Sequence, residues 1–387
     1  MKYFLFRWMT VVAALFFGTM LLPGGSITVQ SGDGWAVALP FGEGHAKAMA
    51  LLEGKTGRLL FGVNPDRCLP MASTTKIMTA LLTLEQPWLD TSFVVDAAAI
   101  QVEGSSMGLK EGDIVTLRTL AAGMLLASGN DAANAAAVAI DGSLSEFAKR
   151  MNRRAAEIGM ENTSFVTPSG LDDENHYSTA RDMGMLACAA LANPDFASLC
   201  SAFTLRLSYG NPPYDRWLQN HNRLLREYDG AIGVKTGYTK KSGRCLVSAA
   251  QRDGTLLVFV TLGASDDWNL HKQALDQGFA ALSQYEVSDF LSQDISVPVT
   301  GGTRSAVTVS PQEETLLSLT AEERGRVEVE LFLPSVVYAP VSEGETLGEM
   351  TLTLDGQQLA QVSMVAQQNS PEKPQEKKKL WDWLKWW

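Results

Sequence analysis

The stretch MASTTKIMTA, residues 71–80, decides how the rest of the chain is interpreted. It places Ser73 and Lys76 three positions apart, directly before an apolar run at residues 77–84 that predicts a buried helix. On a helical turn, residues at i and i+3 share one face, so the lysine amine can lie beside the serine hydroxyl. A lysine takes the proton of a serine only when burial or a nearby positive charge lowers its pKa. Alone, the pattern is more typical of a helix N-cap followed by a solvated lysine.

A second motif, SGN at residues 128–130, lies between an apolar run and an alanine-rich one. Ser128 could relay a proton between Lys76 and a leaving group, and Asn130 could hold Lys76 and donate a hydrogen bond to a substrate carbonyl. The alternative for this segment is a loop with a helix N-cap at Asn130 or Asp131.

A third motif, KTG at residues 235–237, follows a short apolar strand pattern. A strand edge offers its backbone to an extended peptide, Lys235 offers charge to a terminal carboxylate, and Thr236 can add a hydrogen bond. Gly237 would let the substrate backbone come close. Taken alone, the KTG motif is more typical of a turn at the end of a strand. Together, the three motifs in this order and in helix, loop and strand contexts form the signature of penicillin-binding proteins and class A β-lactamases.

Longer segments carry a resemblance to one family, namely MASTTKIMTA (71–80), SGNDAA (128–133), GLD with HYSTA (170–180) and NHNRLL running to GVKTGYT (220–239). The chain resembles the low-molecular-mass penicillin-binding proteins, the D-Ala-D-Ala carboxypeptidases of serine peptidase family S11, and among them the Gram-positive sporulation-type or general enzymes. The resemblance covers roughly residues 46–285 strongly.

The resemblance implies that Ser73 attacks the peptide bond between two D-alanines, that Lys76 is the general base and that Ser128 passes the proton to the leaving D-alanine. It implies an oxyanion hole from the backbone N–H groups of Ser73 and Tyr238. The implied substrate-binding residues are Asn130, Lys235, Thr236, Gly237 and Tyr238. The implied partners are a stem pentapeptide ending in D-Ala-D-Ala and, as inhibitors, β-lactams. Neither a metal nor an organic cofactor is implied.

Two positions depart from the family pattern. Some members carry Arg where His221 stands and His where Tyr238 stands. For His221, a role in structuring its loop and a contact with the substrate carboxylate are equally expected.

The expected fold is an α/β (α+β) catalytic domain with an antiparallel sheet and helices at residues 46–285, then a small all-β domain at residues 290–366. A hairpin is expected at 48–52 and 59–63, because two short apolar runs surround the turn GKTG. Helices are expected at 77–84, 117–127, 131–140, 147–158 and 271–283, and strands at 231–234, 244–250 and 256–263. From residue 295 to 365 helix signals vanish.

Both ends of the chain point to a membrane. Residues 1–38 read as a signal peptide and N-terminal segment, because Lys2 and Arg7 precede an apolar run at 8–22; an uncleaved anchor is the alternative. After a polar linker at 367–376, residues 377–387 place four tryptophans beside lysines, which predicts an amphipathic anchor rather than a disordered tail. We expect an exported protein on the outer face of the cytoplasmic membrane.

Composition excludes other classes. With a formal net charge of −11 the chain is a poor candidate for binding nucleic acid. Four cysteines without CxxC spacing and only four histidines make a zinc site improbable. A disulfide is possible after export, but four buried small hydrophobic cysteines are the favoured expectation.

Three rival functions stay open. A β-lactamase needs fast deacylation, often by a glutamate-activated water, and Glu174 lies in a plausible loop without the matching pattern. An endopeptidase that cuts cross-links is poorly separated by sequence. A non-catalytic penicillin receptor is disfavoured, because Ser73, Lys76 and Ser128 are all present.

Overall fold

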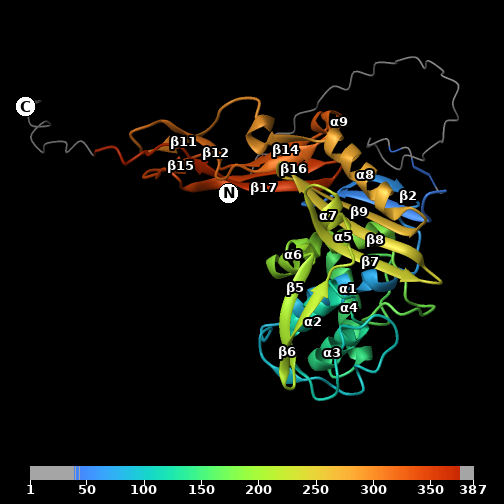
Figure 1. Ribbon diagram of the computed structural model, residues 1–387. Coiled ribbons are helices and arrows are strands. Elements are labelled where there is room, and N and C mark those ends of the chain that lie inside the picture. The colour runs from blue at the N-terminus through green and yellow to red at the C-terminus, as the bar shows by residue number, and fades with distance from the viewer. Residues whose placement is uncertain (1–38, 40, 43, 375–387) are drawn as a thin grey trace, which may run out of the picture. The chain divides into compact units, whose positions relative to one another are not determined.

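A computed structural model describes residues 39, 41, 42 and 44–374 of this chain (Figure 1). The expected signal segment at 1–38, the expected anchor at 377–387 and the last two residues of the expected linker lie outside the described residues. Among the residues that are described, no single helix is long and apolar enough to cross a membrane. The bent pair Ala180–Leu191 and Pro194–Ser201 passes that test only when its two helices are taken together.

A five-stranded antiparallel sheet forms the centre of the catalytic domain, in the order β2-β1-β9-β8-β7. Its strands are β1 Ala48–Glu53, β2 Leu59–Val63, β7 Ala231–Thr239, β8 Gly243–Arg252 and β9 Thr255–Ala264. The predicted hairpin and the three predicted strands are confirmed, and each of the three is longer than its apolar run. Strand β7, which carries the KTG motif, lies at the edge of the sheet.

Helices cover both faces of this sheet because its central strands are apolar on both sides. Successive side chains of a strand point to opposite faces. Accordingly Leu51 packs with α8 (Asp267–Ala281), whereas Leu52 packs with the helices of the other face (Figure 1). Those helices are α1 Lys76–Leu84, α2 Leu117–Leu125, α3 Asn130–Asp141, α4 Leu144–Ile158, α5 Ala180–Leu191 and α6 Pro194–Ser201. The five predicted helices are confirmed.

The helix ends follow the sequence signals. The side chains of Thr116, Ser143 and Thr179 cap α2, α4 and α5, and Gly159 ends α4 in a left-handed conformation with φ 88°. Shorter elements complete the domain: the 3₁₀ turn η1 Ala72–Thr75, α7 Leu224–Glu227, and the pairs β3 Phe93–Val94 with β4 Ile114–Val115 and β5 Thr204–Gly210 with β6 Pro213–Gln219.

The C-terminal domain is built on a six-stranded sheet in the order β14-β16-β17-β12-β11-β15. Its strands are β11 Ile295–Thr300, β12 Ala306–Pro311, β14 Glu328–Phe332, β15 Val337–Tyr338, β16 Thr346–Leu354 and β17 Gln357–Ala366. Strand β10 Ser283–Glu286 pairs with β13 Leu316–Leu319, and the 3₁₀ turn η2 Val287–Phe290 joins β10 to the sheet. The predicted all-β character is confirmed.

One short helix was missed in this domain. Helix α9, Ala321–Arg324, is a single turn in a region where the sequence shows no helical periodicity. It forms because Thr320 and Glu323 make a reciprocal capping box, which satisfies two backbone N–H groups. Four residues are too few for a periodic pattern to reveal.

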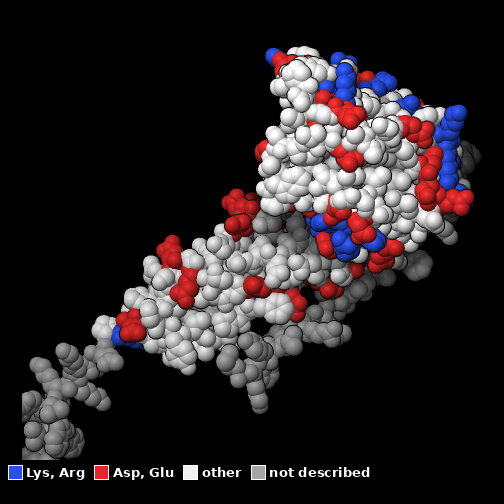
Figure 2. All heavy atoms as spheres, turned by 90° about the horizontal axis from the view of Figure 1, so that it is seen from below, with Lys and Arg blue, Asp and Glu red and all other residues white. Residues whose placement is uncertain are grey.

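The C-terminal domain carries most of the net negative charge of the chain. Residues 285–373 contain fourteen acidic and four basic side chains. On the face shown in Figure 2, red carboxylates are scattered over this domain with little blue beside them. The catalytic domain therefore has nearly balanced charge, whereas the sheet domain repels itself electrostatically.

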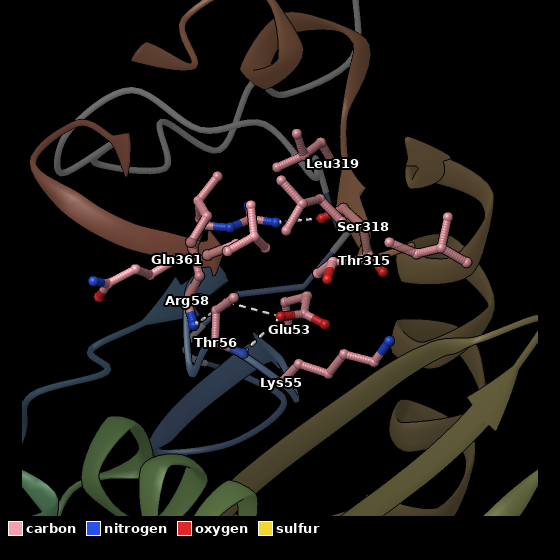
Figure 3. Close-up of a pocket in the computed structure, with 13 residues that line it drawn as sticks. Glu53, Lys55, Thr56, Arg58, Thr315, Ser318, Leu319 and Gln361 are labelled. Atoms are coloured by element: carbon pink, nitrogen blue, oxygen red, sulfur yellow. Dashed lines mark hydrogen bonds between the residues drawn. The ribbon is translucent and has the colours of Figure 1, made fainter. Parts of the chain in front are cut away.

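Buried polar contacts join the catalytic domain to the C-terminal domain. Arg58, before β2, forms a buried ion pair with Glu323 of α9, and its Nη2 donates to the carbonyl of Ser318 at 2.6 Å. Figure 3 shows Arg58 reaching toward Ser318 beside a cavity of about 250 Å³. Removing one member of a buried pair leaves an uncompensated charge, so this contact strongly disfavours separation of the two domains.

The four cysteines are free. The expectation of four buried cysteines is wrong for Cys68, which is exposed, and Cys188 is partly buried, whereas Cys200 and Cys245 are buried. No pair of them forms the disulfide that export would permit.

Candidate active site

The turn that carries Ser73 is held in an uncommon backbone conformation. Ala72 has φ 51°, in the left-handed region that non-glycine residues seldom adopt. Two glycines allow other segments to approach this turn. A Cβ at Gly170 would lie 2.0 Å from the Ala72 carbonyl oxygen, and a Cβ at Gly237 would lie 3.1 Å from the backbone nitrogen of Ser73. The glycine of the KTG motif therefore favours close contact between β7 and the serine turn, independently of any substrate.

Lys76 lies beside Ser73, as the spacing predicts. Its Nζ is 3.0 Å from Ser73 Oγ, 2.6 Å from Asn130 Oδ1 and 2.6 Å from the Ser169 carbonyl oxygen. Burial, and then the charge of Lys235, holds the pKa of Lys76 well below its usual range, against the opposing effect of Asp131. A neutral amine has two N–H bonds and one lone pair. With the amide and the carbonyl as acceptors, the lone pair faces the Ser73 hydroxyl, which is the arrangement a general base needs.

Ser128 also has left-handed backbone, with φ 56°, two residues before the start of α3. In the described part of the chain its hydroxyl accepts a hydrogen bond from Lys235 Nζ at 3.0 Å and makes none with Lys76. Lys235 also donates to the carbonyl of Thr236 at 2.9 Å, and burial lowers the pKa of Lys235 to about 7. Lys235 is thus placed to change the proton affinity of Ser128.

A cavity of about 500 Å³ opens over these groups. It is lined by Ser73, Ser105, Ser128, His221, Thr236, Gly237, Tyr238, Arg244, Cys245, Asp267 and Trp268. All eight predicted site residues lie in this region. Five of them line the cavity, whereas Lys76, Asn130 and Lys235 are buried behind its wall. His221 also lines it, and burial, followed by the charge of Lys235, lowers its pKa.

Sequence reasoning missed the role of Asp131, which it treated only as a helix cap. This buried carboxylate accepts hydrogen bonds from Ser106 Oγ at 2.6 Å and from the backbone N–H groups of Met107, Gly108 and Leu109 at 3.0–3.1 Å. It thereby fixes the segment that carries Ser105 on the rim of the cavity. The acidic residue directly after SGN is the available signal, but a cap and an anchor look alike in a sequence.

Sequence reasoning also missed the structural role of His176. Its Nδ1 accepts the backbone N–H of Val166 at 2.9 Å, so its Nε2 carries the proton and donates to Thr75 Oγ1 at 2.8 Å. Thr75 in turn donates to the Ala72 carbonyl at 2.8 Å. This chain of hydrogen bonds ties the loop before α5 to the turn that carries Ser73. Burial lowers the pKa of His176 to about 4.

Replacing His176 by glutamine should make the free energy of unfolding depend less on pH between pH 4 and 7. In the folded protein the histidine protonates near pH 4, but in the unfolded chain near pH 6.5. The contribution of His176 to the free energy of unfolding is therefore complete above pH 6.5. It is lost as the pH falls toward 4, by roughly 3 kcal/mol in total. Urea unfolding between pH 4 and 7 measures the slope. A control variant at the exposed His45 should keep the wild-type slope, and an unchanged slope in His176→Gln would disprove the neutral buried histidine.

Residues 35–266 match the family model described as D-alanyl-D-alanine carboxypeptidase, peptidase S11, and residues 285–372 match that described as penicillin-binding protein 5, C-terminal domain. The D-alanyl-D-alanine carboxypeptidase DacF of Bacillus subtilis is 32% identical over 370 residues, covering 93% of this chain and 94% of its own. A D-alanyl-D-alanine endopeptidase of Pseudomonas aeruginosa is 32% identical over 213 residues, covering 54% of this chain and 68% of its own. The crystal structure of penicillin binding protein 5 from Haemophilus influenzae superimposes with a TM-score of 0.64 at 25% identity, covering 87% of this chain and 100% of its own.

Proposed function

We propose that Ser73, Lys76 and Ser128 are the catalytic residues of this chain, which belongs to the peptidase S11 family of D-alanyl-D-alanine carboxypeptidases. The protein is a serine-type D-alanyl-D-alanine carboxypeptidase of the penicillin-binding type that acts in cell-wall remodelling. The observation that supports the assignment of residues is the Lys76 amine, which lies 3.0 Å from the Ser73 hydroxyl with its two other partners both acceptors.

In acylation, Ser73 Oγ attacks the carbonyl between the two D-alanines while its proton moves to Lys76. The backbone N–H groups of Ser73 and Tyr238 stabilise the oxyanion, an interaction worth about 3–4 kcal/mol per donor where it has been removed in serine proteases. When the C–N bond breaks, the leaving amine of D-alanine takes a proton delivered through Ser128. An ester to Ser73 and free D-alanine result.

In deacylation, water attacks the ester, Lys76 again accepts the proton, and Ser73 leaves with a proton returned to its oxygen. Lys235 supports both steps through its 3.0 Å hydrogen bond to Ser128. When protonated, it stabilises the negative charge that develops on the Ser128 oxygen as that residue passes on its proton. A β-lactam enters the same sequence, but its leaving nitrogen stays tethered, which delays the entry of water.

The decisive measurement is D-alanine release from a peptide ending in D-Ala-D-Ala. Turnover of this peptide, with slow release of bound penicillin, is the expected pattern. Rapid repeated hydrolysis of a chromogenic β-lactam without D-alanine release would instead identify a β-lactamase. Faster cleavage of a cross-linked peptide dimer than of the linear peptide would identify an endopeptidase.

The location of the enzyme is a second proposal, which rests on the composition of its two ends. We infer that residues 1–38 direct export and that residues 377–387 hold the mature protein on the outer face of the cytoplasmic membrane. Tryptophans favour the interface of a bilayer, and each lysine near an anionic surface contributes about 1 kcal/mol.

Deletion of residues 377–387 should therefore release the mature protein from membranes while peptide hydrolysis in solution stays within about twofold of the full chain. Fractionation of the full-length and shortened proteins measures this. Because salt screens lysines but not tryptophan burial, 1 M salt should release the full-length protein only in part. If the shortened protein still sediments with membranes after its signal segment has been removed, the tail is not the anchor.

A further inference from the structure

One segment of the acidic C-terminal domain exposes apolar side chains at its outward positions. From the end of β14 through β15, residues 331–341 contain no charged side chain. Leu333 and Val337 of this segment pack against the core of the domain. The large side chains that point outward, which we call the apolar stripe, are Phe332, Val336 and Tyr338, and they are 52%, 40% and 75% exposed.

The stripe ends where the chain leaves the domain. Tyr338 pairs in register with Thr300 of β11, and the N–H of Lys373 donates to the carbonyl of Gly301 at 2.8 Å. Figure 1 shows β15 at the end of the sheet from which the chain continues. Residues 377–387 begin four positions after Lys373. The stripe spans at most about 20 Å of extended chain, so these residues can reach all of it.

We propose that residues 377–387 bind to the apolar stripe when no membrane is present, so that the stripe and the bilayer compete for the same segment. This segment contains four tryptophans and four lysines with a single aspartate. Its tryptophans suit the uncharged stripe, and its lysines suit a domain with fourteen acidic and four basic side chains. The catalytic assignment is not involved, but the competition rests on the proposed location of the enzyme.

The charge around the stripe favours this segment over an anionic bilayer as its partner. The exposed charged side chains near the point where the chain leaves the domain are Glu343, Glu345, Glu372, Arg304 and Lys373. Carboxylates outnumber cations there, as they do in the whole domain. Such a surface repels anionic lipid headgroups and attracts lysines.

The covalent connection means that a weak contact is enough. A segment joined to its binding site by a short tether is present there at an effective concentration of about 1 mM. A contact with a Kd of about 1 mM would therefore keep the segment on the stripe roughly half of the time. The apparent affinity for a membrane falls in proportion to the fraction of the protein whose segment is free.

Hydrogen exchange of the backbone at residues 332–340 tests the contact directly. The mature full chain is compared, at two protein concentrations and without vesicles, with a variant that lacks residues 377–387. Exchange should be roughly 2- to 10-fold slower in the full chain, because a bound segment keeps water from these amides. Vesicles of equal parts phosphatidylglycerol and phosphatidylethanolamine should remove the difference, since they draw the segment away.

The affinity for the same vesicles gives a second and independent measurement. The double variant Phe332→Ser/Tyr338→Ser should bind them roughly 2- to 10-fold more tightly than wild type, because the competing site is lost. Both side chains are more than half exposed, so the core of the domain should be unaffected. Trp217→Ser is the matched control. It removes an aromatic side chain, 69% exposed, from β6 of the catalytic domain, and it should keep the wild-type affinity.

Equal exchange in the full and the shortened chain would overturn the proposal. Weaker vesicle binding by the double variant would also contradict it, because the stripe itself would then contact the bilayer. Protection that appears only at the higher protein concentration would identify a second copy of the chain as the partner instead. If the full chain binds no vesicles, the proposed location fails, and slower exchange in the full chain would still support binding of residues 377–387 to the stripe.

Discussion

Replacement of Ser73 by alanine is expected to abolish both penicillin labelling and D-alanine release, with a fall in kcat of about 10⁴-fold or more. The covalent step needs the hydroxyl that Ser73 carries on η1. Ser128 also lines the cavity, but its hydroxyl hydrogen-bonds to Lys235 rather than to the buried amine of Lys76. Ser73 is therefore the serine of this cavity whose hydroxyl contacts the Lys76 amine. The measurements are gel labelling with a fluorescent penicillin and an assay for free D-alanine.

Ser105→Ala is the matched control for this experiment. Ser105 lines the same cavity, but its place there is fixed by its backbone carbonyl, which accepts the Asn130 N–H at 2.7 Å, and not by its hydroxyl. This variant should stay within a few-fold of wild type. Labelling of Ser73→Ala at the wild-type rate would overturn the assignment of the nucleophile.

Replacement of Lys76 should be nearly as damaging, because nucleophile and base act as one unit. We expect both Lys76→Met and Lys76→Arg to slow acylation by about 10³-fold or more. Methionine fills the same buried space without an amine, and arginine introduces a positive charge but has no free lone pair to accept a proton. Stopped-flow acylation by a chromogenic β-lactam measures the rate.

The two variants separate the function of the base from that of a charge. If Lys76→Arg acylates at close to the wild-type rate, a cation beside Ser73 is sufficient and the general-base mechanism is wrong. Lys76→Met should melt a few degrees lower than wild type, because the buried Asn130 Oδ1 and the Ser169 carbonyl lose their donor. In the wild-type enzyme the acylation rate should fall as the pH drops below the lowered pKa of Lys76, since only the neutral amine accepts the proton.

The parts of the site that follow from local geometry could be predicted from the sequence. The i, i+3 spacing of Ser73 and Lys76 leads directly to the 3.0 Å contact, and the apolar run at residues 231–234 leads to the strand that carries Lys235. Long apolar runs and short turns likewise predicted the sheet. These features depend on residues that are close in the sequence.

The parts that depend on distant residues could not be predicted. Asp131 anchors a segment more than twenty residues before it, and His176 holds Thr75 across 101 positions. In a sequence, either residue reads equally well as a cap or as a loop residue. Arg244 stood inside a predicted strand, and only the packing of α8 against β8 showed that Asp267 turns its side chain toward the cavity.

Because the charge is unevenly distributed, raising the ionic strength should stabilise the C-terminal domain more than the catalytic domain. Fourteen acidic side chains against four basic ones lie between residues 285 and 373, and their mutual repulsion is screened over about 8 Å at physiological salt but over about 30 Å at 0.01 M. In dilute buffer the C-terminal sheet should therefore loosen before the charge-balanced catalytic domain does. The Arg58–Glu323 pair, buried where the two domains meet, is shielded from added ions and would keep its strength while the sheet beyond it weakens.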